Sequence, residues 1–446
     1  MPFVCSECGY RSVKWYGRCP NCGAWDSLVE ESTAAEKEDS SWLGEELRAI
    51  TKIDLTELER IPSGFPEFDR LLGGGLVPGG VILFGGEPGI GKSTLLLQLA
   101  DSLAGRCGKV LYVSGEESEG QVKLRADRLG IRSDELFVLS EQALGRISAA
   151  IAKLDPSILI IDSIQTVKSP STEGVAGSLR QLRAVSSEIA KLAKARGMAT
   201  FLVGHITKEG AFAGPKTVEH LVDAAVYMEG SRAEDLRIIR SVKNRFGATN
   251  EVAVFKMTEG GLREVDNPSG FFLDDIGGEP RPGTAVVPIL EGTRPILVEI
   301  QALVSPTGGY GIPQRRCTGL DVNRVLLLLA VIDKRLSINV SGADVYLSIA
   351  GGLEVRERGT DLGVIAAIVS SLRDRPIKVR TALVGEVGLA GEIRPVRRLS
   401  ERIREADKMG YERIIVPSSF KGRSPGEIDV TPVDSIERAI AELELD

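Results

Sequence analysis

Short apolar runs and segments of helical periodicity alternate along the middle of the chain. The apolar runs are typical of buried strands, and they cover residues 81–84, 109–114, 157–162 and 199–204. Between these runs, apolar residues recur at helical spacing, most clearly over residues 94–103 and 178–196. Strands that alternate with helices in this way predict an open parallel sheet, and we expect one α/β domain over residues 53–265.

The rest of the chain predicts two further modules and a linker. Strands are expected over 286–290, 296–304, 345–349 and 382–387, and helices over 323–336, 361–372 and 395–409. This pattern predicts a second α/β domain over residues 266–446. Residues 31–52 are polar and acidic, which predicts a flexible linker after a small N-terminal module of residues 1–30.

The composition of the 446-residue chain is that of a globular protein, with 43% hydrophobic and 26% charged residues. No apolar run reaches the roughly 18 residues of a membrane-spanning helix, and the N-terminus lacks the apolar region of a signal peptide. Six cysteines in this length do not suggest a disulfide scaffold. We therefore expect a cytoplasmic protein without a membrane partner. Because the net charge is −7, any nucleic-acid binding must use local basic loops.

One stretch between an expected strand and an expected helix fits the phosphate-binding pattern G-x-x-x-x-G-K-[ST]. Its predicted nucleotide-binding residues are Gly86, Glu87, Pro88, Gly89, Ile90, Gly91, Lys92, Ser93 and Thr94. Glycines let backbone N–H groups converge on phosphate oxygens, which a side chain would block. Lys92 is expected to reach the β- and γ-phosphates of ATP, and the Ser93 hydroxyl to bind Mg²⁺. The alternative is a glycine turn without a ligand, but both flanks favour the phosphate site.

Three carboxylates follow expected strands, on the side where an open parallel sheet binds its ligand. Asp162 ends a buried run about seventy residues after the phosphate-binding stretch, in the Walker-B manner, and could hold the Mg²⁺ shell. Glu116 and Glu117 follow the strand at 109–114. Either could act as the base that orients the attacking water. We favour Glu116; the other interpretation is a helical first turn in which acidic side chains complement the helix dipole.

Two C-x-x-C pairs near the N-terminus predict a Zn²⁺ site with the ligands Cys5, Cys8, Cys19 and Cys22. The alternatives are two redox dithiols or chance. Since all four ligands would come from the protein, the site would be structural, and so small a module should need the metal to fold. Nearby basic and aromatic residues could contact DNA or a partner, or simply form a solvated face: Arg11, Lys14, Trp15, Tyr16 and Arg18.

Two glycine-containing loops, residues 166–177 and 208–216, follow two adjacent strands of the predicted nucleotide-binding sheet. Their lysines are candidate DNA contacts: Lys168, Lys208 and Lys216. Composition alone does not separate such loops from ordinary surface loops. Lys243 and Arg245, close to a glycine, indicate by themselves no more than a basic turn between strands.

The order of these motifs, followed by the pentapeptide Lys243-Asn244-Arg245-Phe246-Gly247, resembles the bacterial RadA (Sms) family of RecA-like ATPases, which act in recombination. The pentapeptide is the signature of that family, and the resemblance covers nearly the whole chain. It implies that Glu116 is the catalytic glutamate and that His205 links the γ-phosphate to the DNA loop. It also implies that Lys243 is a trans-acting finger, which reaches the ATP of a neighbouring subunit.

The same resemblance implies partners and an assembly. Loops near residues 164–178 and 205–217 would face single-stranded or branched DNA, with Arg245 as a further candidate contact. The family acts with RecA on strand exchange and branch migration. Because a trans-acting finger requires a neighbour, the resemblance implies a homo-oligomeric ring, hexameric as in the family.

Residues 381–396 resemble the proteolytic domain of Lon, which uses a Ser–Lys dyad. The turn that would carry the serine has Asp361 in its place, and the lysine position falls on Ser400. Neither residue can replace the chemistry of the dyad, so the fold is expected without the peptidase activity. Arg315 and Arg316 mark a basic loop over residues 308–316 that could contact DNA.

Taken together, these features predict an α/β protein with an N-terminal zinc ribbon, a RecA-like P-loop ATPase core and a C-terminal Lon-protease-like domain. The expected function is DNA-dependent ATP hydrolysis, with ATP, Mg²⁺ and Zn²⁺, acting on recombination intermediates in DNA repair. Two alternatives belong to other classes: an ATP-dependent protease of the Lon type, and a KaiC-like nucleotide-gated assembly without translocation.

Overall fold

A computed structural model describes residues 3–5, 10–30, 51, 59–205, 218–230, 235–249, 251–273, 280–307, 312–378 and 380–445. The chain divides into two compact units, Met1–Glu57 and Leu58–Asp446. The predicted domain boundaries at 30/31, 52/53 and 265/266 remain predictions. Three of the predicted site residues, Cys8, Lys208 and Lys216, lie outside the described residues.

The first unit contains a small antiparallel sheet. Its strands are β1 (Phe3–Cys5), β2 (Arg11–Ser12) and β3 (Leu28–Glu30), with β1 in the centre. In the described part of this unit, the buried apolar side chains are Cys5, Cys19 and Leu28, with Phe3 packed against them. A core of this size cannot offset the conformational entropy lost on folding, so cross-linking by a metal is the expected source of stability.

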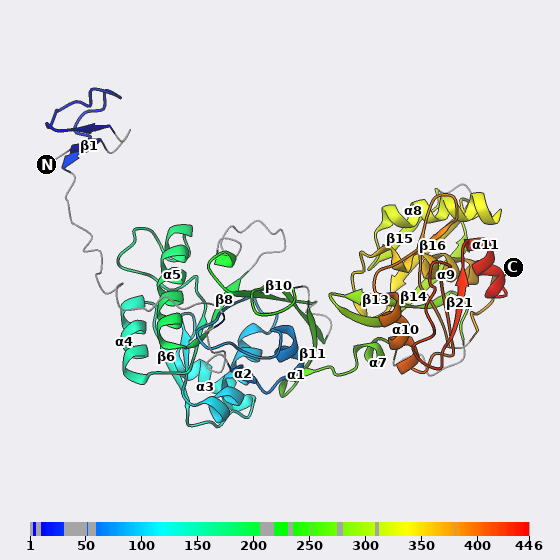
Figure 1. Cartoon of the computed structure of the whole chain (residues 1–446), viewed down its shortest axis with the longest axis horizontal. Helices are drawn as coiled ribbons and strands as arrows, with labels where there is room; N and C mark the ends of the chain where they lie inside the picture. The colour runs from blue at the N-terminus through cyan, green and yellow to red at the C-terminus, as the bar shows by residue number, and fades with distance from the viewer. Residues whose placement is uncertain are drawn as a thin grey trace. The chain divides into compact units, whose positions relative to one another are not determined.

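The second unit begins with a nine-stranded sheet of order β12-β11-β10-β9-β4-β8-β7-β5-β6 (Figure 1). Six neighbouring strands are parallel: β4 (Val81–Gly86), β5 (Val110–Ser114), β6 (Leu136–Ser140), β7 (Ile158–Asp162), β8 (Ala199–His205) and β9 (Ala224–Glu229). Three antiparallel strands extend one edge: β10 (Leu236–Asn244), β11 (Val252–Thr258) and β12 (Gly261–Glu264). The strands and the parallel sheet predicted from the apolar runs are confirmed.

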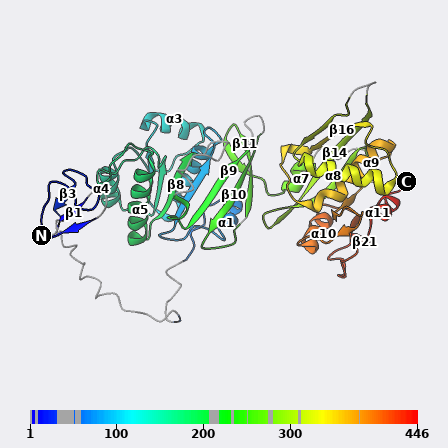
Figure 2. The ribbon, with the colours of Figure 1, turned by 90° about the horizontal axis from the view of Figure 1, so that it is seen from above.

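Helices cover both faces of this sheet (Figures 1 and 2). One face packs against α1 (Pro66–Leu71), α2 (Lys92–Cys107) and α3 (Glu119–Arg128), and the other against α4 (Leu144–Leu154) and α5 (Leu179–Arg196). Successive side chains of a strand point to opposite faces. In β4, for example, Ile82 and Phe84 join the first core, and Val81 and Leu83 join the second. The buried runs are therefore continuous, since both faces are covered.

A seven-stranded sheet of order β15-β16-β14-β13-β17-β20-β21 forms the second α/β part. Its strands are β13 (Thr284–Glu291), β14 (Arg294–Pro306), β15 (Arg315–Thr318), β16 (Ala343–Ile349), β17 (Thr381–Leu383), β20 (Arg413–Pro417) and β21 (Asp429–Val433). One core contains side chains of α8 (Val322–Val331), α9 (Asp361–Arg373) and α11 (Ile436–Glu442). On the opposite side, α10 (Leu399–Lys408) contributes to a smaller core.

Two expected elements of this part differ from the structure. The strand expected over 382–387 is wrong in its extent: β17 ends at Leu383, and β18 (Glu386–Val387) instead pairs with β19 (Ile393–Arg394). Between them, the main chain of Gly385 bonds to Gly359 and Leu362, which takes it away from the sheet. The helix expected from residue 395 begins only at Leu399, because Arg398 has a left-handed φ of 53°.

Within the described residues, no helix combines the length and the apolar character that crossing a lipid bilayer requires.

Candidate functional site

The predicted phosphate-binding stretch lies between the C-terminal end of β4 and the N-terminal end of α2. Gly86, Gly89 and Gly91 have φ values of 154°, 75° and 117°, which only glycine adopts readily. A Cβ atom at Gly86 would lie 2.7 Å from the Met228 carbonyl oxygen. The first turn of α2 has no acidic residue, so the positive end of the helix dipole is free to favour phosphate.

Lys92 is the first residue of α2, and its side chain is buried. Its ammonium group donates to the carbonyl oxygens of Gly86 and Glu87, at 2.9 and 2.8 Å, and lies 3.1 Å from Nδ1 of His205. An ammonium has three donors, so all are used within the chain. Burial lowers the pKa of Lys92 to about 8, although Asp162, Glu116 and Glu87 raise it in part.

His205 ends β8 and bridges Lys92 to Glu116. Its Nε2 lies 3.2 Å from Oε1 of Glu116, while Nδ1 faces the ammonium of Lys92. Because a charged ammonium can only donate, Nδ1 must accept, and the proton of a neutral imidazole then lies on Nε2 and is donated to the glutamate. The lysine, the predicted sensor and the predicted base therefore form one chain of contacts at the carboxyl ends of β4, β8 and β5, of which β8 and β5 are separated by β7.

The two candidate bases have different surroundings. Glu116 has a side chain that is 49% exposed, and its Oε1 also accepts a hydrogen bond of 2.7 Å from the Ser163 hydroxyl. Glu117 is instead paired with Arg125, whose Nη2 lies 2.5 Å from Glu117 Oε1. Because Glu117 is held by an ion pair and Glu116 faces the lysine and the histidine, the geometry favours Glu116 as the base.

Asp162 ends β7 opposite Ser114 at the end of β5. Its Oδ2 accepts a hydrogen bond of 2.6 Å from the hydroxyl of Tyr112, and burial raises the pKa of that phenol, so it remains a donor. Mg²⁺ prefers oxygen ligands, and the Asp162 carboxylate and the Ser93 hydroxyl both supply oxygen. The chemistry of these two side chains therefore fits the prediction that they bind Mg²⁺.

Three side chains of this site were not predicted from the sequence. Ser163 donates to Glu116, Tyr112 donates to Asp162, and Gln165 binds the main chain of His205. Ser163 directly follows the Walker-B aspartate, and that adjacency is a signal that could have found it. Gln165 and Tyr112 carry no signal in the sequence, because their roles depend on which strands are neighbours.

Lys243 lies near the end of β10, at an irregularity between Ser241 and Lys243, and the turn expected around Lys243 and Arg245 begins only at Arg245. Its ammonium donates to the carbonyl oxygens of Glu219 and Val222, at 2.6 and 2.7 Å. Burial, with the nearby Arg245, lowers the pKa of Lys243. Its hydrogen bonds are thus with its own chain at residues 219–222 and not with the phosphate-binding stretch.

The remaining basic candidates for DNA contact differ in their exposure and in their ion pairs and hydrogen bonds. Lys168 and Arg316 are exposed. Arg245 forms an ion pair of 3.1 Å with Asp223. Arg315 donates to main-chain carbonyls of Gln314 and of residues 340–343. Arg315 and Arg316 begin β15, so they stand in a strand and not in the expected loop.

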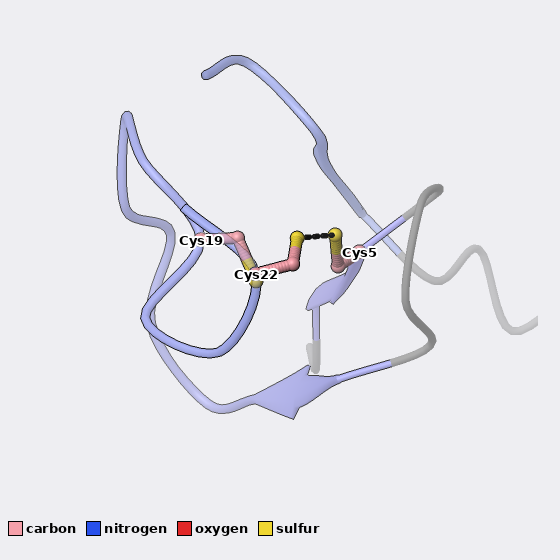
Figure 3. Close-up of side chains that lie close together, drawn as sticks. All are labelled: Cys5, Cys19 and Cys22. Atoms are coloured by element: carbon pink, nitrogen blue, oxygen red, sulfur yellow. Dashed lines mark hydrogen bonds between the residues drawn. The ribbon is translucent and has the colours of Figure 1, made fainter. Parts of the chain in front are cut away.

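Three of the four predicted zinc ligands meet in the first unit, and the fourth, Cys8, lies outside the described residues. The sulfur atoms of Cys5, Cys19 and Cys22 all lie within 4.8 Å of one another (Figure 3). Those of Cys5 and Cys22 are 3.6 Å apart. Zn–S bonds of about 2.3 Å in a tetrahedron place two sulfurs about 3.8 Å apart, so the thiols fit a zinc ion.

Asp361, which stands where Lon has its serine, is buried at the start of α9. Two nitrogens of Arg324 donate to its carboxylate: Nε to Oδ1, at 3.0 Å, and Nη2 to Oδ2. The Val387 N–H also donates to Oδ2, at 3.0 Å. Ser400, at the position of the Lon lysine, is exposed on α10. Both features fit the prediction that this domain lacks peptidase chemistry.

Family models match three parts of the chain. Residues 46–211 match an AAA domain family, residues 3–30 a rubredoxin metal binding domain, and residues 350–430 the Lon protease (S16) C-terminal proteolytic domain. Among solved structures, a KaiC-like protein from Pyrococcus horikoshii OT3 aligns with a TM-score of 0.41 and 19% identity, over 47% of this chain and 99% of that chain.

Curated relatives match along almost the entire length. The DNA repair protein RadA of Bacillus subtilis is 46% identical over 447 residues, which cover 98% of this chain and 97% of the relative. RadA of Halalkalibacterium halodurans is also 46% identical, with the same coverage. RadA of Streptococcus pyogenes serotype M6 is 49% identical over 94% of this chain and 92% of the relative. The predicted combination of zinc ribbon, ATPase core and Lon-like domain is confirmed, and the chain belongs to the RadA family of DNA repair proteins.

Proposed function

We propose that this protein is a DNA-dependent ATPase of the helicase type, which processes recombination intermediates and promotes branch migration in RecA-mediated strand exchange. The observation that carries the proposal is the chain of contacts from Lys92 through His205 to Glu116. It joins a phosphate-binding cation, a sensor and a base at one end of a parallel sheet, in a member of a DNA repair family.

In the proposed reaction, Lys92 and the backbone of residues 86–91 bind the phosphates of ATP, and Ser93 and Asp162 hold Mg²⁺, which neutralises phosphate charge. Glu116 orients the attacking water and accepts its proton. When the phosphates of ATP bind the Lys92 ammonium, His205 Nδ1 loses its hydrogen-bond donor. The contact of the imidazole with Glu116 can therefore depend on whether ATP is bound. ATP, Mg²⁺ and Zn²⁺ are the proposed cofactors.

The proposed assembly is a homo-oligomeric ring, with six subunits by analogy to the family, in the cytoplasm. The proposal of a ring is supported by the position of Lys243. The ammonium of Lys243 donates to the carbonyl oxygens of Glu219 and Val222 in the same chain. If Lys243 acts in hydrolysis, the phosphates it reaches are those of a neighbouring subunit. Single-stranded or branched DNA and RecA are the proposed partners, with Lys168, Arg245 and Arg316 among the candidate DNA contacts.

The two alternatives are less well supported. A Lon-type protease would need a nucleophile where Arg324 instead holds Asp361. A KaiC-like assembly would not need the zinc ribbon or the pentapeptide at 243–247. A casein degradation assay tests the first alternative, and strand displacement on forked DNA tests the second.

The proposed function is tested by the rate of ATP hydrolysis with and without single-stranded DNA. We expect DNA to raise the rate, and the protein to extend heteroduplex in joint molecules that RecA has formed. A rate that DNA does not change, together with no effect on joint molecules, would contradict the proposal.

A further inference from the structure

Gln165 makes a double contact with the main chain of His205. Its Nε2 donates to the His205 carbonyl oxygen, and its Oε1 accepts from the His205 N–H, both at 3.2 Å. This is the only arrangement of the amide that satisfies both groups, because the main-chain N–H must donate and the carbonyl must accept. One side chain thus fixes both polar groups of the residue that carries the imidazole.

The reason for this contact lies in the sheet. Strands β7 and β8 pair in parallel up to Ile161 and Leu202, and the N–H of Ile164 still bonds to Val203 at 2.9 Å. Beyond Ile164 the chain turns away into the loop of residues 166–177, while β8 continues to His205. The N–H and carbonyl of His205 on this side therefore lose their strand neighbour, and the amide of Gln165, which resembles a peptide group, takes its place.

The same turn also holds the base. Ser163, two residues before Gln165, is fully buried and donates to Glu116. The following loop is fixed by a second glutamine, Gln181 of α5, whose amide binds the N–H and the carbonyl of Ser169. His205, Glu116 and the loop at 166–177 are therefore attached to one short segment.

From these contacts we propose that Gln165 is a positioning residue for ATP hydrolysis, which fixes His205 between Lys92 and Glu116 and joins it to the loop at 166–177. This inference rests on the proposed ATPase function. When Gln165 is removed, the imidazole of His205 loses its fixed place. A displacement of about 1 Å at such a point can cost on the order of 100-fold in rate.

The test compares three variants of the full chain by steady-state ATPase kinetics. Gln165→Ala is expected to lower kcat by roughly 10- to 100-fold with little change in the KM for ATP. Gln165→Glu is expected to regain activity as the pH falls, because a protonated carboxyl can both donate and accept as the amide does. The matched control is Gln98→Ala, whose amide makes the same double contact with the main chain of Leu262, at 3.1 and 2.9 Å. It should alter stability and leave kcat nearly unchanged.

A double-mutant cycle separates positioning from folding. In a His205→Ala background, Gln165→Ala should cause little further loss of kcat, since it acts through the imidazole. Losses that multiply, an unchanged kcat in Gln165→Ala, or an equal loss in Gln98→Ala would each overturn the inference. Wild-type protein that hydrolyses no ATP at all would overturn the proposed function instead, so the two failures are distinguishable.

Discussion

Two carboxylates show how differently the two α/β parts of the second unit use an acidic residue. Glu116 follows β5 with a side chain that is 49% exposed, and its partners are a serine hydroxyl and a histidine. Asp361 has a side chain that is 2% exposed, and its donors are Arg324 and the Val387 N–H. The first carboxylate remains open to a water molecule. The second is buried, and three donors of its own chain already bind its two oxygens.

The comparison teaches that a carboxylate in a site-like position has a chemical role only if its lone pairs are left available. Mutations should therefore have opposite consequences in the two parts. Changes at the phosphate site should reduce turnover and leave the fold intact, and changes at Asp361 should reduce stability and leave turnover per folded molecule intact.

The largest effect is expected for Glu116→Gln. The amide keeps the size of the side chain but cannot accept a proton, and a general base typically contributes about 10²–10⁴ in rate. We expect kcat to fall within that range while ATP binding persists, measured by single-turnover hydrolysis and by nucleotide titration. Glu117→Gln, which removes the ion pair with Arg125, should cost far less. If the two variants show the reverse order, the base is Glu117.

Lys243→Ala should have an effect of similar size. A cation that arrives from outside the phosphate-binding stretch stabilises transition-state charge, and fingers of this kind contribute about 10³–10⁵ in rate. The lysine ammonium is a point charge and cannot bind two phosphate oxygens side by side as an arginine guanidinium does. We therefore expect kcat to fall by about 10³-fold, the lower end of this range. Mixing this variant with Lys92→Ala protein should restore part of the activity, because some interfaces then combine an intact finger with an intact phosphate site. No recovery in rings shown to exchange subunits would contradict the trans assignment and leave Lys243 a role in DNA binding or in its own fold, through Glu219 and Val222.

The sequence predicted much of the fold because the parallel strands are buried on both faces. Continuous apolar runs such as 81–84 and 157–162 carry that signal directly, and the P-loop pattern requires its glycines for steric reasons. The short elements at 382–387 and 395–398 were misplaced, because tertiary hydrogen bonds of Gly385 and the left-handed φ of Arg398 determine them.

The site was predictable only where one residue type at one spacing carries the chemistry. Lys92, Glu116 and Asp162 are such residues; the structure places them at one end of the parallel sheet, and their roles stay predictions. Gln165 acts through the main chain of a residue that is forty positions away in sequence, and only the order of the strands brings the two together. The environment of Lys243 likewise depends on carbonyls of residues 219 and 222, which no side-chain pattern reveals.

Asp361→Ala tests the other half of the comparison. Removal of one partner from a buried ion pair typically costs about 3–5 kcal/mol of stability, and here it leaves Arg324 and the Val387 N–H without their acceptor. We expect the free energy of unfolding to fall by about 3 kcal/mol, the lower end of this range, since the Arg324 side chain is 22% exposed. Chemical denaturation measures this free energy. Replacing both partners, with Asp361→Leu and Arg324→Met, should restore most of the stability. A large loss of kcat at full folding would instead couple this domain to hydrolysis.

The smallest expected effect is a pH dependence at Lys92. Burial lowers the pKa of its ammonium to about 8 in the nucleotide-free protein, and phosphate charge should raise it again. Below pH 8 the lysine is already charged, so the Kd for ATP should be flat. Above pH 8 binding must take up a proton, and Kd should rise by up to about tenfold per pH unit until the pKa of the complex is reached. Titration calorimetry in buffers of different ionisation enthalpy measures the proton uptake.

Stability should change in the opposite direction over the same window. The folded pKa of Lys92 lies below its unfolded value of 10.5, so between these values the unfolded chain binds more protons, and the contribution of Lys92 to stability rises with pH. Lys92→Arg, which stays charged, should remove both slopes. If nucleotide affinity and the Lys92-dependent part of stability fall together above pH 8, burial does not lower the pKa of Lys92, and the predicted proton uptake on ATP binding is wrong.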